Sequence, residues 1–264
     1  MIALRRGDHG LRFVGVVHLL PLPGAPVRAD LDAALARARH DARALVQGGA
    51  DAVIVENFGD APFAPRRVPA ATISAMTRAV GVVRDAAPGL DVGVNVLRND
   101  ALAAMAIAAC TGSDFIRVNV LSGVMVTDQG VIEGEARDLI ALRTALGAQI
   151  AVVADVMVKH ATPLGSTSLE DAARDTWHRA GADVVVVTGR GTGLPTSLDD
   201  ADRVRAVIPE APLWVGSGVT LESAEGLRAR VDGAIVGTWL HEDGSVRQPL
   251  CPRRVEAMRR VLKG

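Results

Sequence analysis

Residues that can carry out acid–base chemistry follow several short apolar runs of this chain. Glu56 follows Ala52–Val55, and Asp155 follows Ile150–Ala154. A carboxyl group at the end of a buried strand is a candidate general acid or base, because it is partly withdrawn from water yet open to a ligand. His18 ends another such run and is a candidate proton carrier or metal ligand. We therefore predict that these three side chains are catalytic.

A fourth candidate catalytic residue is Lys159. It and Lys263 are the only lysines among the 29 basic residues, and Lys263 lies near the C-terminus. A lysine ammonium is a compact charge that can approach a phosphate, a carboxylate or a carbonyl closely. We predict a functional role for Lys159, and a solvated loop charge is the alternative.

Further polar residues follow the same runs and are predicted to bind a substrate: Asn57, Asn95, Arg117, Asn119 and His160. Buried polar groups cost about 1–3 kcal/mol each when unpaired, so their accumulation at the ends of the runs favours a polar pocket. Each residue alone could instead support a loop. One carboxylate could also pair with Arg98 or Arg117 to hold the rim.

A metal site is a weaker hypothesis. A divalent ion held by Glu56 and Asp155, with His18 or His160 as a further ligand, would suit the donor types. No HxH or HExxH spacing supports it, so the sequence leaves open whether a divalent metal binds and which residues would be its ligands.

Two runs near the C-terminus end in small residues, which leave backbone N–H groups accessible to an anion. Leu213–Val215 precedes Gly216-Ser217-Gly218, and Gly233–Val236 precedes Gly237-Thr238. A helix beginning near Thr220 would direct further N–H groups at the same point. A third run ends in small residues at 188–189. The predicted phosphate-binding residues are Thr188, Gly189, Gly216, Ser217, Gly218, Gly237 and Thr238.

The elements that must position these residues alternate along the chain. Short β-branched runs predict eight strands, and longer segments rich in Ala, Leu and Arg predict helices between them. The predicted strands are Phe13–His18, Asp51–Glu56, Asp91–Val96, Asp114–Val120, Ile150–Asp155, Asp183–Thr188, Leu213–Gly216 and Gly233–Gly237. The predicted helices are 30–48, 69–87, 99–111, 133–147, 168–181, 198–208, 220–230 and 252–262.

This alternation predicts an α/β fold, a single (β/α)8 TIM barrel that occupies residues 1–264. Phosphate sites of such barrels are frequently built from the loops after strands seven and eight, where the two glycine turns fall. A flavodoxin-like or Rossmann sheet is the alternative. The first βα turn has no G-x-G-x-x-G, and the glycines at 189–193 lie late in the chain and precede a proline, so no dinucleotide cofactor is predicted.

Composition excludes several classes of function. The chain has 264 residues, 49% hydrophobic and 22% charged, with a net charge of −1. No basic patch indicates a nucleic-acid partner, and no apolar run reaches the roughly 18 residues of a transmembrane segment. The first residues do not resemble a signal peptide, so we expect a cytoplasmic protein. Cys110 and Cys251 indicate neither a disulfide framework nor a zinc site.

Two segments between the predicted elements are unusually long. Leu19–Pro26 contains three prolines and is expected to be stiff and extended. Leu121–Glu133 contains an apolar stretch and is expected to form a lid or a subunit contact. A homo-oligomer is therefore expected.

Several motifs together resemble one family along nearly the whole chain. They are His18–Gly24, Gly48–Phe63, Val94–Asp100, Phe115–Asn119, Ala154–Val156 with Lys159-His160, Val187–Gly189 and Gly216–Gly218. In these motifs the chain resembles the BtpA family. The resemblance implies a TIM barrel similar to phosphate-binding barrel enzymes. The family takes its name from a role in photosystem I biogenesis in cyanobacteria, and that name assigns no reaction to any of these residues.

Two hypotheses of function follow. The first is an enzyme that acts on a phosphorylated small molecule, a sugar phosphate or a nucleotide-derived phosphate, as a lyase, isomerase or hydrolase with acid–base chemistry. The second is a non-catalytic assembly factor of the photosystem I biogenesis type, which binds protein partners. The polar residues that end the strands favour the enzyme.

Overall fold

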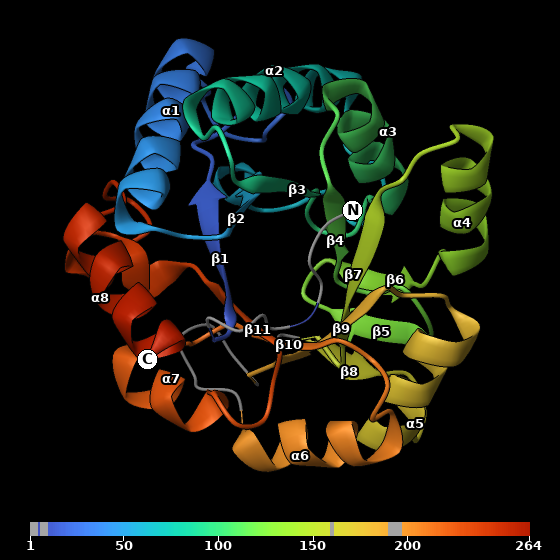
Figure 1. Cartoon of the computed structure of the whole chain (residues 1–264). Coiled ribbons are helices and arrows are strands. Elements are labelled where there is room, and N and C mark those ends of the chain that lie inside the picture. The colour runs from blue at the N-terminus through green and yellow to red at the C-terminus, as the bar shows by residue number, and fades with distance from the viewer. Residues whose placement is uncertain (1–4, 6–9, 159–160, 190–196) are drawn as a thin grey trace.

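Eight parallel strands close into a barrel at the centre of the molecule (Figure 1). The computed structural model describes Arg5 and residues 10–158, 161–189 and 197–264. The barrel order is β1-β11-β10-β9-β7-β4-β3-β2. The strands are β1 (Arg12–His18), β2 (Ala52–Glu56), β3 (Asp91–Asn95), β4 (Phe115–Val118), β7 (Ala151–Val156), β9 (Val184–Thr188), β10 (Leu213–Gly216) and β11 (Gly233–Val236). The predicted (β/α)8 TIM barrel and its eight strands are confirmed.

Helices surround the barrel in the predicted order (Figure 1). They are α1 (Leu31–Gly48), α2 (Ala70–Ala86), α3 (Ala101–Thr111), α4 (Ala136–Ala145), α5 (Leu169–Arg174), α6 (Leu198–Val207), α7 (Leu221–Leu227) and α8 (Pro252–Lys263). Side-chain caps start several of them, as when Asp30 accepts a hydrogen bond from the Ala33 N–H at the start of α1. The segment predicted as one helix over 168–181 changes after Arg174 into a π-helical turn, Asp175–Arg179.

Strand residues alternate between two apolar layers, as a pleated strand requires. Outward residues such as Val53 and Val55 pack in the large cluster beneath the helices. Inward residues such as Val14, Ile54 and Val186 form a separate cluster inside the barrel. The strands are therefore buried on both faces, which explains their continuous apolar sequences.

Two aromatic rings fill the lower part of the barrel interior. Phe115 and Trp214 are fully buried and meet edge to face, with ring centroids 6.1 Å apart. Each ring lies against a strand glycine, because a Cβ on Gly93 would come within 2.3 Å of Phe115 and a Cβ on Gly233 within 2.8 Å of Trp214. The amino-terminal half of the barrel interior is therefore a packed apolar floor.

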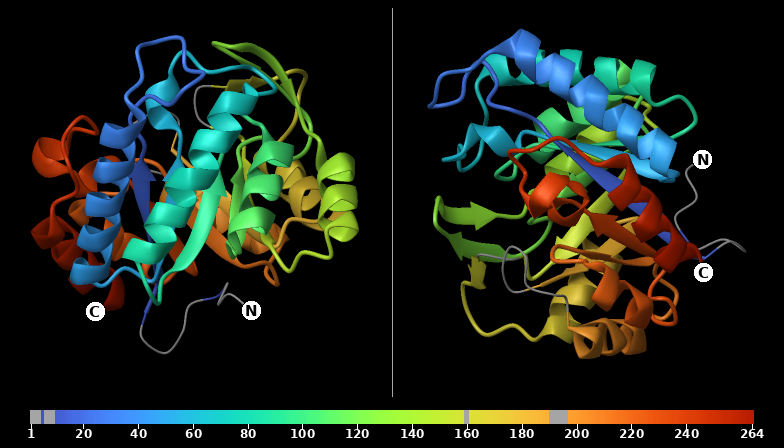
Figure 2. Two further views of the ribbon diagram at one scale, coloured as in Figure 1. Left: turned by 90° about the horizontal axis from the view of Figure 1, so that it is seen from above. Right: turned by 90° about the vertical axis from the view of Figure 1, so that its left-hand side faces the viewer.

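A small antiparallel sheet lies beyond the carboxyl ends of the barrel strands (Figure 2, right). It consists of β5 (Val124–Thr127), β6 (Gly130–Glu133) and β8 (Ala161–Pro163), in the order β6-β5-β8. The sequence predicted a lid or subunit contact in this region but no strands. Met125 and Ile132 pack against residues that follow β4 and β7, so the hairpin has its own apolar core. The subunit contact stays a prediction.

Among the helices of the described residues, none combines the length and the apolar character needed to cross a membrane.

Candidate active site

The inward positions at the carboxyl ends of the barrel strands form one polar layer above the aromatic floor. The strand register places His18 beside Glu56, Glu56 beside Asn95, and Asn95 beside Arg117. All four side chains belong to residues that are at most 8% exposed. Asp155 and Thr188 occupy the corresponding inward ends of β7 and β9. The structure therefore brings these six predicted site residues together.

Glu56 is held by an amide and lies near a cation. Asn95 Nδ2 donates a 2.6 Å hydrogen bond to Glu56 Oε2, and Arg117 Nη1 lies 3.9 Å from the same oxygen. The carboxyl group is buried, but at 3.9 Å it is only loosely paired with the guanidinium. Glu56 is thus oriented without being tied into a close ion pair, a suitable arrangement for a group that transfers protons.

Asp155 is bound far more tightly than Glu56. Arg117 donates to both of its carboxylate oxygens, from Nε at 3.1 Å and from Nη2 at 3.0 Å, and Asn119 Nδ2 donates at 2.9 Å. Burial disfavours the Arg117 cation, but attraction to Asp155 and Glu56 outweighs it, so the pKa of Arg117 is raised. This bidentate geometry makes Asp155 the anchor of Arg117.

Two buried polar atoms at this layer have no hydrogen-bond partner within the described parts of the chain. They are Asn119 Oδ1 and Thr188 Oγ1. Because Asn119 uses its nitrogen to donate to Asp155, its oxygen is fixed as an acceptor. Buried unpaired polar groups are uncommon and costly, so both atoms are candidate contacts for a ligand.

Arg98 belongs to the site, although the sequence indicates it only as an alternative partner for a carboxylate at the barrel rim. It follows β3, is 7% exposed, and lies in the field of Asp155, Glu56 and Asp128. Burial lowers the pKa of Arg98, although those three carboxylates oppose the shift. With Arg117 it gives the polar layer two buried cations beside two carboxylates. Its position in the sequence, three residues after Asn95 at the end of β3, is the signal that could have found it.

His18 lies in a pocket of aromatic and small residues. Its ring meets Phe58 edge to face at 4.9 Å, and its Nδ1 lies 2.8 Å from Nε2 of His241. A Cβ on Gly237 would come within 2.9 Å of His18 Cε1, so this predicted phosphate-binding glycine also makes room for the histidine. His241 was not predicted, because nothing in its local sequence marks it.

Asn57 is buried and serves the backbone. Its Oδ1 accepts from the Leu97 N–H at 2.7 Å, and its Nδ2 donates to Asp60 at 3.0 Å and to the Leu97 carbonyl at 3.4 Å. The amide therefore holds the segment after β3 in place. This is the loop-support role that the sequence left open for it.

The glycine turns after β10 and β11 lie side by side, because Gly216 pairs with Ile235. Ser217 and Gly218 both have left-handed backbone, with φ of 66° and 69°. Among the described residues, the N–H groups of Gly218, Val219 and Thr238 have no acceptor. Backbone N–H groups without an acceptor on two neighbouring turns favour an anion at this edge of the barrel.

Other predicted parts of the phosphate site have different surroundings. The N–H groups of Thr220 and Ser223 are occupied by a capping box at the start of α7, so they do not add to an anion site. Gly216 lies against Arg117, whose Nη2 would be 3.5 Å from a Cβ there. Gly189 follows β9 and is buried. Lys159 and His160 lie outside the described residues.

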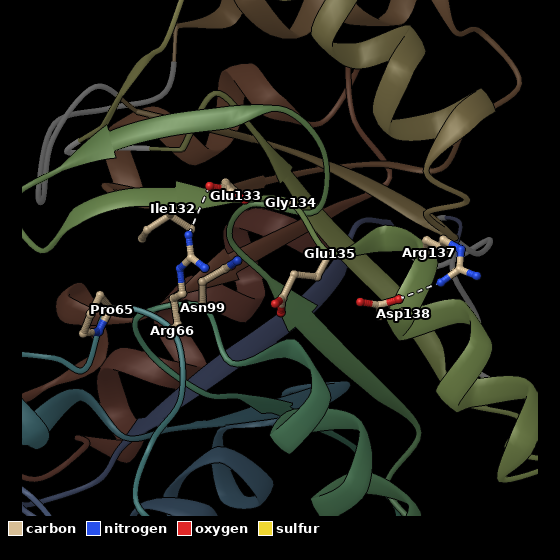
Figure 3. Close-up of a pocket in the computed structure, with 9 residues that line it drawn as sticks. All are labelled: Pro65, Arg66, Asn99, Ile132, Glu133, Gly134, Glu135, Arg137 and Asp138. Atoms are coloured by element: carbon tan, nitrogen blue, oxygen red, sulfur yellow. Dashed lines mark hydrogen bonds and ion pairs between the residues drawn. The ribbon is translucent and has the colours of Figure 1, made fainter.

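A separate polar cavity of about 400 Å³ lies between the segment after β2 and the start of α4 (Figure 3). Arg66 donates to Glu133 at 3.1 Å, and Arg67 pairs with Glu135 through two bonds of 2.8 Å. These contacts tie the segment after β2 to the β5–β6 hairpin and to α4. The described residues that line this cavity include none of the predicted site residues. Within the described ranges, no group of three or more His, Cys, Asp or Glu residues is arranged to hold a metal ion.

The closed barrel and the polar layer at the carboxyl ends of its strands define a TIM-barrel protein with a candidate ligand site in the usual position. The chain belongs to the BtpA family, whose profile matches residues 11–264. It is 46% identical over 247 residues to the photosystem I biogenesis protein BtpA of Synechocystis, with 92% of this chain and 85% of that protein covered. It is 44% identical over 251 residues to an uncharacterized protein of Thermococcus kodakarensis, with 95% and 94% covered.

Solved structures show the same fold at much lower sequence identity. N-(5'-phosphoribosyl)anthranilate isomerase from Pyrococcus furiosus matches with a TM-score of 0.56 at 15% identity, covering 95% of this chain and 98% of that one. A structure titled "Native KDPGal structure" matches with a TM-score of 0.59 at 15% identity, covering 97% and 96%. At these identities the likeness establishes the fold alone.

Proposed function

We propose that this protein is an enzyme that acts on a phosphorylated small molecule by acid–base chemistry at the polar layer of its barrel. The observation that carries the proposal is the arrangement of Glu56, which is buried, oriented by Asn95 and loosely paired with Arg117. A carboxyl group so placed next to two buried arginines can move a proton while the cations stabilise negative charge that develops on the substrate.

The four predicted catalytic residues take different roles in this proposal. Glu56 and His18 transfer protons, because both are oriented by a neutral partner. Asp155 holds Arg117 in place, since it accepts two hydrogen bonds from Arg117 and a third from Asn119. Lys159 keeps its predicted role as a cation near the substrate.

The substrate phosphate binds at the turns after β10 and β11. Support comes from the N–H groups of Gly218, Val219 and Thr238, which have no acceptor among the described residues. It also comes from a barrel of the same fold whose name includes a 5'-phosphoribosyl group. A sugar phosphate or a nucleotide-derived phosphate would reach from these turns across the barrel axis to Glu56. Lyase, isomerase and hydrolase reactions all fit this geometry.

A second candidate function is the assembly role, which the name of the Synechocystis relative favours. The outer face of the β5–β6 hairpin carries Val126 and Val131, at 42% and 44% exposure, and would supply a contact for a protein partner. This candidate gives no role to the polar layer inside the barrel, so we place it second.

A thermal-shift screen tests the proposed enzyme. The purified protein is heated with inorganic phosphate, sugar phosphates and nucleotides, with and without divalent metal. A ligand at a hundredfold excess over its dissociation constant adds about 2.7 kcal/mol of apparent stability. We expect one phosphorylated class to stabilise the protein, which then gives a substrate for assay.

Two variants of Ser217 locate the anion. Asp and Asn both tolerate the left-handed backbone at this position and have nearly the same shape, so they differ mainly in charge. Ser217→Asp should abolish the stabilisation, and Ser217→Asn should retain most of it. Equal stabilisation of both variants by the ligand would show that the phosphate does not bind at this turn. No stabilisation of the unaltered protein by any phosphorylated compound would remove the enzyme proposal and favour the assembly role.

A further inference from the structure

A chain of hydrogen bonds connects His18 on β1 to the segment before α8. His18 Nδ1 lies 2.8 Å from His241 Nε2, and His241 Nδ1 lies 2.7 Å from the backbone carbonyl oxygen of Gln248. His241 is completely buried and His18 is 8% exposed. The two rings are tilted by 31°, with centroids 5.1 Å apart. Two histidines in direct ring-to-ring contact therefore share one proton position between them.

The carbonyl at the end of the chain determines where each proton lies. An oxygen of this kind can only accept, so His241 Nδ1 must carry hydrogen. Burial, and then the nearby His18, lower the pKa of His241 to about 4, so the ring is neutral at physiological pH and its Nε2 has a lone pair. His18 Nδ1 must then donate to that lone pair. A neutral His18 consequently has its own lone pair on Nε2.

We infer that His241 is a positioning residue that fixes the proton of His18 on Nδ1 and so makes Nε2 of His18 the basic atom of the site. The tautomer of His18 follows from these contacts alone. Only the use of Nε2 as a base in a reaction rests on the proposed function. Without His241, the His18 ring would lose the acceptor that holds its proton on Nδ1, and a hydrogen bond of this kind selects the tautomer of a neutral histidine.

A buried ion pair on α1 holds His241 and its acceptor. Arg37 Nε donates to Asp41 Oδ2 at 2.8 Å, and Arg37 Nη2 contacts both the Gln248 carbonyl oxygen and His241 Nδ1, the latter at 3.4 Å. Asp41 Oδ1 accepts from the Leu250 N–H at 2.9 Å. The titratable and charged groups that act on His241 are His18 from β1 and Arg37 and Asp41 from α1. The Arg37 cation further opposes protonation of His241, while Asp41 favours it.

The edge of the His18 ring that carries Nε2 lies next to the turn after β11. A Cβ on Gly237 would come within 3.2 Å of Nε2 and 2.9 Å of Cε1. The basic atom is therefore close to the turn that contains the Thr238 N–H. In the proposed reaction His18 enters as a base: Nε2 takes a proton from a substrate O–H or C–H group, and the electron pair of that bond remains on the substrate. His18 becomes an imidazolium that donates from both nitrogens, with its bond to His241 unbroken.

Nitrogen NMR reads the tautomer directly and needs no ligand. Long-range proton–nitrogen correlation spectra of the 15N-labelled full chain at pH 8 report the protonation of each ring nitrogen in its six histidines. A His18→Gln spectrum assigns the His18 signals. We expect protonated Nδ1 and unprotonated Nε2 for both His18 and His241.

Two variants of His241 separate positioning from packing. In His241→Gln the amide oxygen can still accept from His18 Nδ1, whereas His241→Leu fills the space with no acceptor. We expect the glutamine variant to keep the proton of His18 on Nδ1 and the leucine variant to lower the share of His18 that is protonated there. His178, which is exposed, should not change in either variant.

Two results would overturn the inference: a protonated Nε2 on neutral His18 in the unaltered protein, or an unchanged His18 tautomer in His241→Leu. The unaltered protein alone decides the first, even if a variant fails to fold. Because no ligand is present, these spectra are independent of the thermal-shift screen. A failed screen with the expected tautomer would remove the proposed enzyme and leave the positioning of His18 intact.

Discussion

Replacement of Arg117 by methionine should destabilise the protein strongly, because it leaves a carboxylate without its partner. The Asp155 side chain is fully buried, and two of its three hydrogen bonds come from Arg117. Only the bond from Asn119 would remain. Breaking a buried pair by removing one partner costs about 3–5 kcal/mol, because the other charge stays in a medium of low polarity.

The double variant Arg117→Met/Asp155→Leu should recover most of this loss. It removes both charges, so no uncompensated ion is left, and apolar side chains take their place. The remaining costs are the looser attraction of Arg117 to Glu56, 3.9 Å away, and the lost acceptor of Asn119. We expect a net loss of about 1–2 kcal/mol for the double variant.

Thermal unfolding followed by circular dichroism measures both variants. One kcal/mol corresponds to about 2–4 °C in Tm for chains of this size, so Arg117→Met should lower Tm by roughly 6–20 °C. The double variant should unfold at a higher temperature than the single variant. The single variant Asp155→Leu completes the cycle. If Arg117→Met loses less than about 1 kcal/mol, or if the loss of the double variant equals the sum of the losses of Arg117→Met and Asp155→Leu, the two side chains do not form a buried ionic contact.

Two further predictions concern the floor of the barrel and the buried histidine. Gly93→Ala should destabilise the protein by about 1–3 kcal/mol, because its Cβ would lie 2.3 Å from the Phe115 ring. Gly81→Ala has open space around it inside α2 and should stabilise the protein by about 0.5–1 kcal/mol. Urea unfolding measures both variants, and a change of stability in the same direction in both would contradict the packing argument. The pKa of His241 is 6.5 in the unfolded chain and about 4 in the folded protein, so between these values only the unfolded chain binds a proton there. The free energy of unfolding should therefore fall as the pH decreases through this range. Between pH 7 and 5 the protein should lose about 2 kcal/mol more than His241→Gln does, and parallel losses in the two proteins would refute the burial of a neutral His241.

The barrel could be predicted from the sequence because its strands are buried on both faces. Runs such as Val184–Val187 have no polar residue on either face, and this pattern separates a parallel barrel strand from the half-exposed strand of an antiparallel sheet. The same reasoning located the polar layer, since Glu56 and Asp155 end such runs. Both predictions rest on the apolar pattern of the strands and on the place of the carboxyl groups at the strand ends, and neither of these depends on contacts between distant segments.

The parts that could not be predicted depend on contacts between segments far apart in the chain. His241 acquires its role from His18, 223 residues away, and from a backbone carbonyl that has no sequence signature. Asn57 differs from Asn95 only in its partners, one a backbone segment and the other a carboxylate. The β5–β6 hairpin was missed because Val124–Thr127 is short and packs on residues that follow two other strands.

The aromatic floor of the barrel determines how molecules can travel to and from the polar layer. Phe115 and Trp214 are fully buried and close the barrel axis from below, so the axis is not a tunnel. Whatever reaches Glu56 must arrive and depart through the same opening. An incoming molecule therefore has to wait until the previous one has left. In such an enzyme, product that rebinds would compete with substrate for the same opening. This product inhibition would be competitive, so saturating substrate would relieve it.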